Sequence, residues 1–375
     1  MTLSSRQRRQ LSLVIAVVAI VLALAPIPGL RRPLRVATGS ELEEPMRQLE
    51  ARFERANPDI DLIVEVQGAQ DMVNRSQDGG DSGPQRRSRV LIPANGALLT
   101  ELAERRRALG LPLPFHSEPQ PVARTLLVAV VWAERSQVLF GSGPFSWPRL
   151  RRAVEAGNWR ALGGPPAWGS FDLRITDPAR SNSGQLTLAL WTRDRLGPTA
   201  LTQPAAQIGA IERALVPLRR AVYQPPRSTD ILLREFIAAG PNDGDVAMVY
   251  ESAALARWAE ALQRQGQPYR ILYPNPTFET VLTAVVMDGS AEGSAADGER
   301  FVAFLRQGEQ QLQLRRWGYR PAQGPLPQAA LAGTPWGLVR SGVLSDPGAG
   351  RLPPPSAPIQ AELLRGWQRA EAGSG

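Results

Sequence analysis

The residues best suited to bind a ligand lie between residues 173 and 191, in the segment LRITDPARSNSGQLTLALW. The pattern predicts a strand over residues 173–176, which Pro178 ends, and an apolar helix from about residue 185. Between the two lie three small polar side chains, Ser181, Asn182 and Ser183. The first N–H groups of a helix have no partner within it, so this loop can bind an anion or a polar group. The alternative is a loop that only caps its own helix.

The same arrangement, a strand end followed by a polar residue and a helix, recurs at four other places. The polar residues there are Ser40 with Glu41, Asn95, Thr229 and Glu251. A polar loop that joins a strand to a helix forms the floor of a pocket, and five such loops in one chain favour a binding role over simple capping.

The side-chain inventory excludes several classes of protein. The chain has no Cys, which excludes disulfides, thiolate metal sites and a cysteine-linked lipid anchor. Its one His, His116, lies in a Pro-flanked segment typical of a loop, and no nucleophile–base–orienter set is visible. We therefore expect a protein that is not an enzyme and that needs neither a metal ion nor a cofactor.

The formal charge of +8 does not predict nucleic-acid binding. All 43 basic residues are Arg, and five of them lie in the first 32 residues, which contain no acid. The rest of the chain therefore carries a net charge of only about +3, without a dense basic run interleaved with aromatic residues. We expect no nucleic-acid partner.

The N-terminus has the pattern of an export signal. Three arginines precede an apolar run over residues 11–26, and positive residues stay on the cytoplasmic side of the membrane. The run is intermediate in length between a signal-peptide core and a membrane span. Ala-Leu-Ala at residues 23–25 resembles a cleavage site, but Pro26 disfavours cutting there. We expect residues 1–32 to be a signal peptide or a signal-anchor helix, with the uncleaved anchor favoured.

The length of 375 residues is too great for one ordinary core, so two lobes are expected. Residues 122–132 are almost all apolar, as a central buried strand would be, and this strand is long enough to leave one lobe and enter another. Residues 281–287 resemble a return strand. Other strands are expected at residues 34–37, 60–66, 90–92, 245–250 and 269–273. Further helices are expected at about residues 44–56, 97–109, 147–159, 209–219, 231–239, 253–263, 301–317 and 359–370.

Seven segments, taken in order, carry a resemblance: TGSELEEP, VLIPANGALLTEL, ARTLLVAVVW, FSWPRL, WGSFDLRITDPARSNSGQLTLALW, GDVAMVYES and GYRP. Together they resemble the type II extracellular solute-binding proteins of bacterial ABC-type transport systems, two-lobed hinge proteins that include molybdate and sulfate binders. The resemblance spans about residues 34–370. It implies an α/β, two-lobed periplasmic-binding-protein-like fold type II, each lobe a mixed sheet flanked by helices, preceded by an N-terminal membrane helix. Lobe 1 would comprise residues 33–130 with 276–375, and lobe 2 residues 131–275.

The resemblance also implies a cleft between the lobes, at the carboxyl ends of the strands, that binds and does not catalyse. By position, its ligand-binding residues would be Ser40, Glu41, Asn95, Ser181, Asn182, Ser183, Thr229 and Glu251. Hydroxyls and helix N-termini suit an oxyanion or a polar solute. If Glu41 and Glu251 both face the cleft, they repel an oxyanion unless they are protonated or paired with Arg124 or Arg180. They suit a cationic, zwitterionic or sugar-like ligand better.

Plain structural roles remain open for several of these residues. Ser40 and Ser183 are also good N-caps, and Glu251 is favoured at a helix start even when it is exposed to solvent. Ser40 could form a capping box with Glu43, or the helix could begin after it, with Pro45 in its first turn.

Two functions follow from this reasoning. The first is a receptor that captures a small polar or anionic solute and delivers it to an ABC-type permease. The second is a membrane-anchored envelope interaction module with the same fold and no transported ligand. Both would be monomeric and periplasmic or otherwise extracytoplasmic, held at the inner membrane by the N-terminal helix or released by cleavage. We expect Ser40, residues 181–183 and Glu251 to converge on one enclosed cleft, which favours the receptor.

Overall fold

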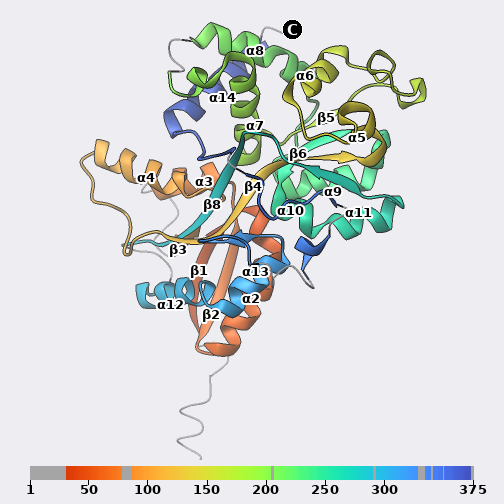
Figure 1. Ribbon diagram of the computed structural model, residues 1–375. Coiled ribbons are helices and arrows are strands. Elements are labelled where there is room, and N and C mark those ends of the chain that lie inside the picture. Colours follow the sequence, from red (N-terminus) through yellow and green to blue (C-terminus); the bar gives the residue numbers. More distant parts are fainter. Residues whose placement is uncertain are drawn as a thin grey trace, which may run out of the picture.

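A computed structural model of the protein shows one continuous mixed sheet covered by helices (Figure 1). It describes residues 31–77, 87–203, 207–289, 293–327, 334–338, 341–348 and 350–372. The ten-stranded sheet has the order β2-β1-β3-β8-β4-β6-β5, with β7 and β9 paired to β4 and β10 paired to β8.

Lobe 1 is built on three parallel strands, β1 (Arg32–Thr38), β2 (Ile60–Val66) and β3 (Val90–Ile92). Apolar residues at helical spacing bury one face of α2 (Glu43–Ala56) against them, and Phe53 of this helix meets Phe301 edge-on with ring centroids 5.1 Å apart. The other helices of this lobe are α3 (Ala69–Gln77), α4 (Ala97–Ala108), α12 (Ala295–Leu305) and α13 (Gly308–Arg316).

Two long strands, β4 (Gln120–Trp132) and β8 (Thr277–Val286), run from one lobe into the other. Residues 120–126 of β4 pair antiparallel with β8, and residues 127–132 pair with the strands of lobe 2. Residues 126–132 are completely buried, as the nearly unbroken apolar run predicts. These strands therefore connect the two lobes.

Lobe 2 contains β5 (Leu173–Arg174), β6 (Val246–Tyr250) and β7 (Tyr269–Leu272). Trp132, at the end of β4, stacks on Phe236 with ring centroids 4.9 Å apart and so joins the sheet to a covering helix. Its helices are α5 (Ala133–Phe140), α6 (Trp147–Ala156), α7 (Asn182–Leu196), α8 (Ile208–Ala221), α9 (Thr229–Ala239), α10 (Glu251–Ala256) and α11 (Trp258–Gln265).

The C-terminal helix α14 (Ala357–Ala372) does not lie in lobe 1, to which the expected domain division assigned it. It packs on α7 and α8 of lobe 2, and Leu363 and Trp367 are buried in the same core as Leu215. The reason is the path of the chain after β9 (Arg320–Pro321). The next strand, β10 (Arg351–Leu352), pairs with the N-terminal end of β8, which leaves the chain beside lobe 2.

Several other elements differ in extent from the expected ones. The helix expected at residues 253–263 is divided into α10 and α11, and the one at 301–317 into α12 and α13. Helices α3 and α5 form where none was expected, and α7 begins at Asn182 instead of about residue 185. The start of α7 therefore includes the polar residues of the loop.

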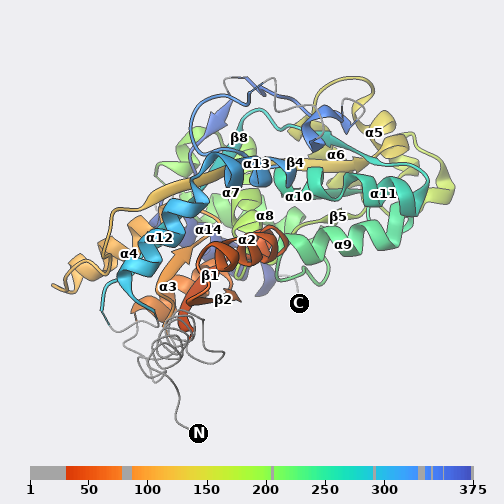
Figure 2. The same ribbon diagram turned by 90° about the horizontal axis from the view of Figure 1, so that it is seen from below.

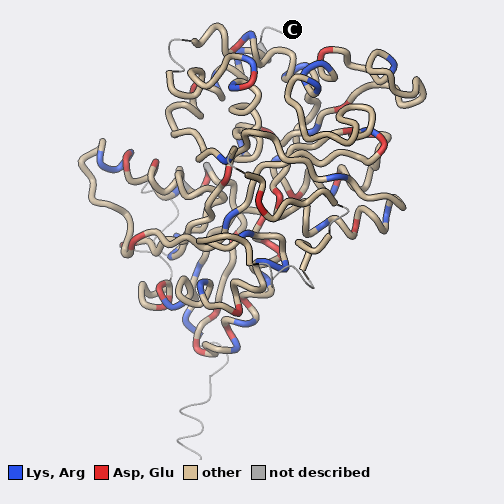
Figure 3. The backbone as a smooth tube through the Cα atoms, viewed as in Figure 1, with Lys and Arg blue, Asp and Glu red and all other residues tan. Residues whose placement is uncertain are grey.

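The expected membrane segment, residues 11–26, lies outside the described part of the chain. Within the described part, no helix is both long and apolar enough to cross a membrane. Basic and acidic residues are interspersed over both lobes (Figure 3).

Candidate ligand-binding cleft

A cleft of about 760 Å³ lies between the lobes and receives residues from both. Lobe 1 contributes residues that follow β1 and β2, and lobe 2 contributes the starts of α7 and α9 and the end of β6. The short helix η1 (Ser40–Leu42) of lobe 1 contacts α9 of lobe 2, and Figure 2 shows the two lobes from below. The polar residues that line the cleft are Ser40, Glu41, Glu43, Glu65, Gln67, Asp71, Arg75, Arg180, Ser181, Asn182, Arg227, Ser228, Asp230, Arg234 and Tyr250.

A chain of buried hydroxyls supports the floor of the cleft. The Ser183 Oγ lies 2.8 Å from the Thr176 Oγ1, 2.7 Å from the Thr229 Oγ1 and 3.2 Å from the Ser181 Oγ. Ser183 is completely buried and Thr229 is 2% exposed. Of the eight residues expected to bind ligand, these two therefore lie beneath the cleft, where they tie the start of α7 to the start of α9.

Gly184 allows this close approach of α7 to the end of β5. A Cβ at this position would lie 2.5 Å from the Thr176 carbonyl oxygen and 3.0 Å from the Pro178 backbone. No side chain fits at such distances, so glycine is required for the loop to fold back under the helix.

Asn182 and Tyr250 form a buried polar pair that faces the cleft. The Asn182 Nδ2 donates a hydrogen bond of 2.8 Å to the Tyr250 hydroxyl. The Asn182 Oδ1 is buried, and no described residue donates to it. A buried acceptor without a donor is costly, so this oxygen is well placed to accept a hydrogen bond from a ligand.

Glu41 supplies a second unsatisfied acceptor, from the opposite lobe. The residue as a whole is half-buried, but its Oε1 is inaccessible to solvent and accepts no hydrogen bond in the described structure. Burial raises the pKa of this carboxyl to about 7. Burial, followed by the nearby Glu41 charge, also raises the pKa of Tyr250. The Glu41 carbonyl oxygen accepts a hydrogen bond of 2.8 Å from the Tyr319 hydroxyl, which fixes the loop.

Arginine side chains at the edge of the cleft carry free charge. Arg75, Arg180 and Arg227 are exposed and form no hydrogen bond or ion pair through their side chains with any described residue. Arg234, by contrast, is paired with Asp230 at 3.0 Å. An anionic group in the cleft would therefore find unpaired cations at the edge.

Asn95 and Glu251 do not line this cleft. The Asn95 Oδ1 accepts a hydrogen bond of 3.0 Å from the Ala97 N–H and so caps the start of α4. The neighbouring residue Ala94 reaches the cleft in its place.

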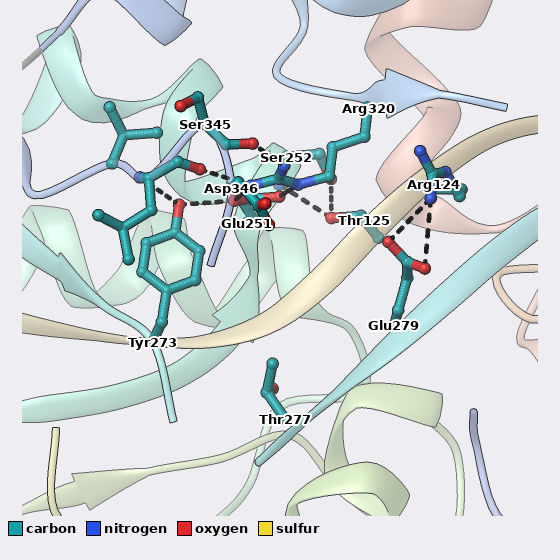
Figure 4. Close-up of polar contacts among 12 residues, drawn as sticks. Arg124, Thr125, Glu251, Ser252, Tyr273, Thr277, Glu279, Arg320, Ser345 and Asp346 are labelled. Atoms are coloured by element: carbon teal, nitrogen blue, oxygen red, sulfur yellow. Dashed lines mark hydrogen bonds and ion pairs between the residues drawn. The ribbon is translucent and has the colours of Figure 1, made fainter. Parts of the chain in front are cut away.

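Glu251 is completely buried in an ion pair with Arg320 (Figure 4). Its two carboxylate oxygens each lie 2.7 Å from a guanidinium nitrogen of Arg320, and one also accepts a hydrogen bond of 2.6 Å from the Tyr273 hydroxyl. Arg320 further donates to the backbone oxygens of Leu344 and Ser345. Glu251 therefore has protein partners for its charge, and we assign it a structural role.

Sequence reasoning overlooked Tyr250 and Arg227, and it named Arg180 only as a possible partner for Glu41 or Glu251. Tyr250 is the last residue of β6. The sequence criterion selected the residue that follows each strand, which is Glu251 here, and so it missed Tyr250. Arg180 and Arg227 each come directly before the N-cap residue of a helix, Ser181 or Ser228. A basic residue at that position is the signal that could have found them.

Among the residues that the structure describes, no three His, Cys, Asp or Glu side chains come together in a way that could hold a metal ion.

The chain belongs to a family of bacterial extracellular solute-binding proteins, whose model matches residues 34–320. Its two-lobed α/β fold is the one seen in solved substrate-binding proteins of this kind. No curated protein matched the sequence.

Solved structures with the same fold are binding proteins of low sequence identity. A periplasmic thiamin binding protein is 16% identical, with a TM-score of 0.62, over 91% of this chain and 97% of that one. The sulfate-binding protein SubI from Mycobacterium tuberculosis H37Rv is 14% identical, with a TM-score of 0.56, over 92% and 99%. A ferric binding protein from Campylobacter jejuni is 12% identical, with a TM-score of 0.55, over 90% and 97%. At such identities the likeness establishes the fold and leaves the ligand open.

Proposed function

We propose that this protein captures a small polar or anionic solute in the cleft between its lobes and delivers it to an ABC-type importer. The observation that carries the proposal is the pair of buried acceptors, the Glu41 Oε1 and the Asn182 Oδ1, which come from different lobes and have no donor in the described structure. A ligand that satisfies both would favour the closed arrangement by its differential affinity for it.

We further propose that Ser40, Glu41, Ser181 and Asn182 contact the ligand, and that Ser183 and Thr229 hold these residues in place. We also propose that the protein is monomeric and lies outside the cytoplasm, near the permease. The export pattern of residues 1–32 supports this location, either as an anchor helix or as a cleaved signal.

Thermal-shift screening of the purified protein tests the proposal. The panel contains oxyanions, sugars, amino acids, polyamines, thiamin and ferric citrate. A ligand that binds only the folded state raises the melting temperature in proportion to RT ln(1 + [L]/Kd), which is about 2.7 kcal/mol at one hundred times the Kd.

We expect at least one compound to raise the melting temperature, and Asn182→Ala to abolish or strongly reduce the rise. Gln263→Ala is the matched control, because Gln263 is exposed on α11 and does not line the cleft. A panel without any shift, or a shift that Asn182→Ala leaves unchanged, would contradict the proposal and favour an envelope module without a transported ligand.

A further inference from the structure

The two walls of the cleft carry opposite charge. On the wall of lobe 1, the ionisable residues are Glu41, Glu43, Glu65, Asp71 and Arg75. On the wall of lobe 2, they are Arg180, Arg227, Arg234 and Asp230. Lobe 1 therefore presents mostly carboxylates to the cleft, and lobe 2 mostly guanidinium groups.

Internal ion pairs remove some of these charges and leave the asymmetry in place. Glu65 is paired with Arg35, Glu43 with Arg47 at 2.8 Å, and Arg234 with Asp230. The charged side chains that form no ion pair with a described residue are Glu41 and Asp71 with Arg75 on lobe 1, and Arg180 and Arg227 on lobe 2.

The backbone of lobe 2 adds to its preference for an anion. Arg180 and Arg227 directly precede the N-cap residues of α7 and α9, so each of these arginines is the residue next to a helix N-terminus. The Ser228 side chain already accepts from the Ile231 N–H, whereas the Ser181 side chain makes no such capping bond to α7. The first N–H groups of α7 therefore remain available for an anionic group.

Lobe 1 offers the complementary chemistry. The Glu41 Oε1 is a buried acceptor without a donor. A second such acceptor, the Asn182 Oδ1, lies on the facing wall, and the residue Asn182 as a whole is 95% buried. An ammonium or another N–H group satisfies such oxygens, whereas a second anion would be repelled by the ionised carboxylate.

We propose that the cleft binds a solute with charges of both signs, whose anionic group contacts Arg180, Arg227 and the start of α7 and whose amino or other N–H group contacts Glu41. This inference rests on the proposed function, because it names the class of ligand for the same cleft. The solute would be an organic molecule with a phosphate or carboxylate at one end and a cationic nitrogen at the other.

Two matched sets of probes test the charge requirement by isothermal titration calorimetry. The small set is O-phosphoethanolamine, ethanolamine and inorganic phosphate. The larger set is thiamin monophosphate, thiamin and phenyl phosphate. We expect a probe with both charges to bind about tenfold or more tightly than either partner in its set, as the loss of one charge-assisted hydrogen bond predicts.

Two substitutions with matched controls test the orientation. Glu41→Gln should weaken the two-charge probe about tenfold or more and leave phenyl phosphate bound as well as before, or better. Arg180→Gln should weaken both of these probes. Glu104→Gln and Arg152→Gln alter exposed charges outside the cleft and should change neither.

Proton linkage at neutral pH gives a readout independent of affinity. The other ionisable groups that lie near the Glu41 carboxyl or line the small hollow beside it are Tyr250, Tyr319, Asp230, Arg257, Glu44 and Glu260. A cationic nitrogen at Glu41 favours the ionised carboxyl, so the wild type should release more protons on binding than Glu41→Gln does. Titrations in two buffers of different ionisation enthalpy measure this difference.

Several results would overturn the inference. They are equal or tighter binding of a one-charge probe, proton uptake at Glu41, or a ligand from the thermal-shift panel that is a simple oxyanion or a neutral sugar. Those results leave the receptor function intact. If the protein binds none of the probes and nothing in the panel, the receptor function is contradicted as well. The oppositely charged walls of the cleft would then serve only to attract each other.

Discussion

Glu41 should make the stability of the unliganded protein depend on pH. Its carboxyl has a pKa of about 7 in the folded protein and an ordinary value of 4.5. Between these values the folded chain holds a proton that the unfolded chain has released, so the contribution of Glu41 to stability falls as the pH rises through this window.

Urea denaturation at about pH 5 and about pH 7.5 measures this effect. The loss of stability with rising pH should be smaller for Glu41→Gln than for the wild type, because Gln does not titrate. Glu104→Gln, an exposed carboxyl outside the cleft, should keep the wild-type loss. If Glu41→Gln lost as much stability as the wild type between these two pH values, the Glu41 carboxyl of the wild type would be ionised at both of them.

Arg320 should be far more important for folding than a surface arginine. Its partner Glu251 is completely buried, and Arg320→Met would leave that carboxylate with only the Tyr273 hydroxyl. Breaking a buried pair in this way costs about 3–5 kcal/mol. Denaturant titration should show such a loss in the free energy of unfolding.

Arg47→Met provides the matched comparison, because Arg47 makes exposed pairs with Glu43 and Glu44 on one helix. Its cost should be below about 1 kcal/mol. Similar losses for the two variants would mean that the Glu251–Arg320 pair contributes little, and would reopen a ligand role for Glu251.

The Glu251–Arg320 ion pair could not be predicted by considering one residue at a time. Glu251 is one of the residues that follow a strand and begin a helix, and by that criterion it is equivalent to Ser181. Its partner Arg320 lies 69 residues away, beyond β7 and β8. Local sequence contains no signal for such a pairing, so the burial of Glu251 could not be predicted.

At the scale of elements, the junction between β5 and α7 should tolerate no side chain at position 184. Gly184→Ala would place a Cβ 2.5 Å from the Thr176 carbonyl oxygen, so the loop or the helix must shift. We expect a loss of about 1–3 kcal/mol in the free energy of unfolding, as for other overpacked sites.

Gly209→Ala in α8 is the control for the same chemical change. Its added Cβ would meet only the end of the flexible Arg213 side chain, at 3.5 Å. Alanine is the better helix former by about 1 kcal/mol, so this variant should be neutral or more stable. If Gly184→Ala were equally harmless, the close approach of α7 to β5 would not be required.

Elements with strong local patterns were predictable, and those that depend on tertiary contacts were not. The apolar run of β4 and the helical spacing of α2 identified both elements closely. By contrast, α14 packs on α8, where the Arg219 guanidinium lies 5.1 Å from the centroid of the Trp367 ring, although the two residues are far apart in the sequence. Its sequence shows an amphipathic helix but gives no indication of which lobe will cover it.

At the scale of the whole molecule, the N-terminal segment should decide the location of the protein. Three arginines followed by the apolar run of residues 11–26 predict export, with the lobes outside the cytoplasm. The full chain should be digested by protease added to intact spheroplasts, and a variant without residues 1–32 should be protected. Protection of the full chain would contradict the proposed location.

The two-lobed architecture itself could be recognised from the order of several segments along the chain. No single motif is specific for it. The chemistry of the cleft could be predicted only in part, because Ser40, Glu41, Ser181 and Asn182 follow strand ends, whereas the opposition of charged walls depends on how the lobes face each other. These charged residues lie at widely separated positions in the sequence, which does not indicate which of them face each other.

The central claim is that one ligand is shared between the two lobes, and a calorimetric titration tests it most directly. A ligand from the thermal-shift panel is titrated into the wild type, Glu41→Ala on lobe 1 and Asn182→Ala on lobe 2. We predict one ligand per chain and a loss of affinity of about tenfold or more in each variant. Affinity unchanged in either variant would mean that the ligand binds elsewhere or to one lobe alone, which would contradict the claim.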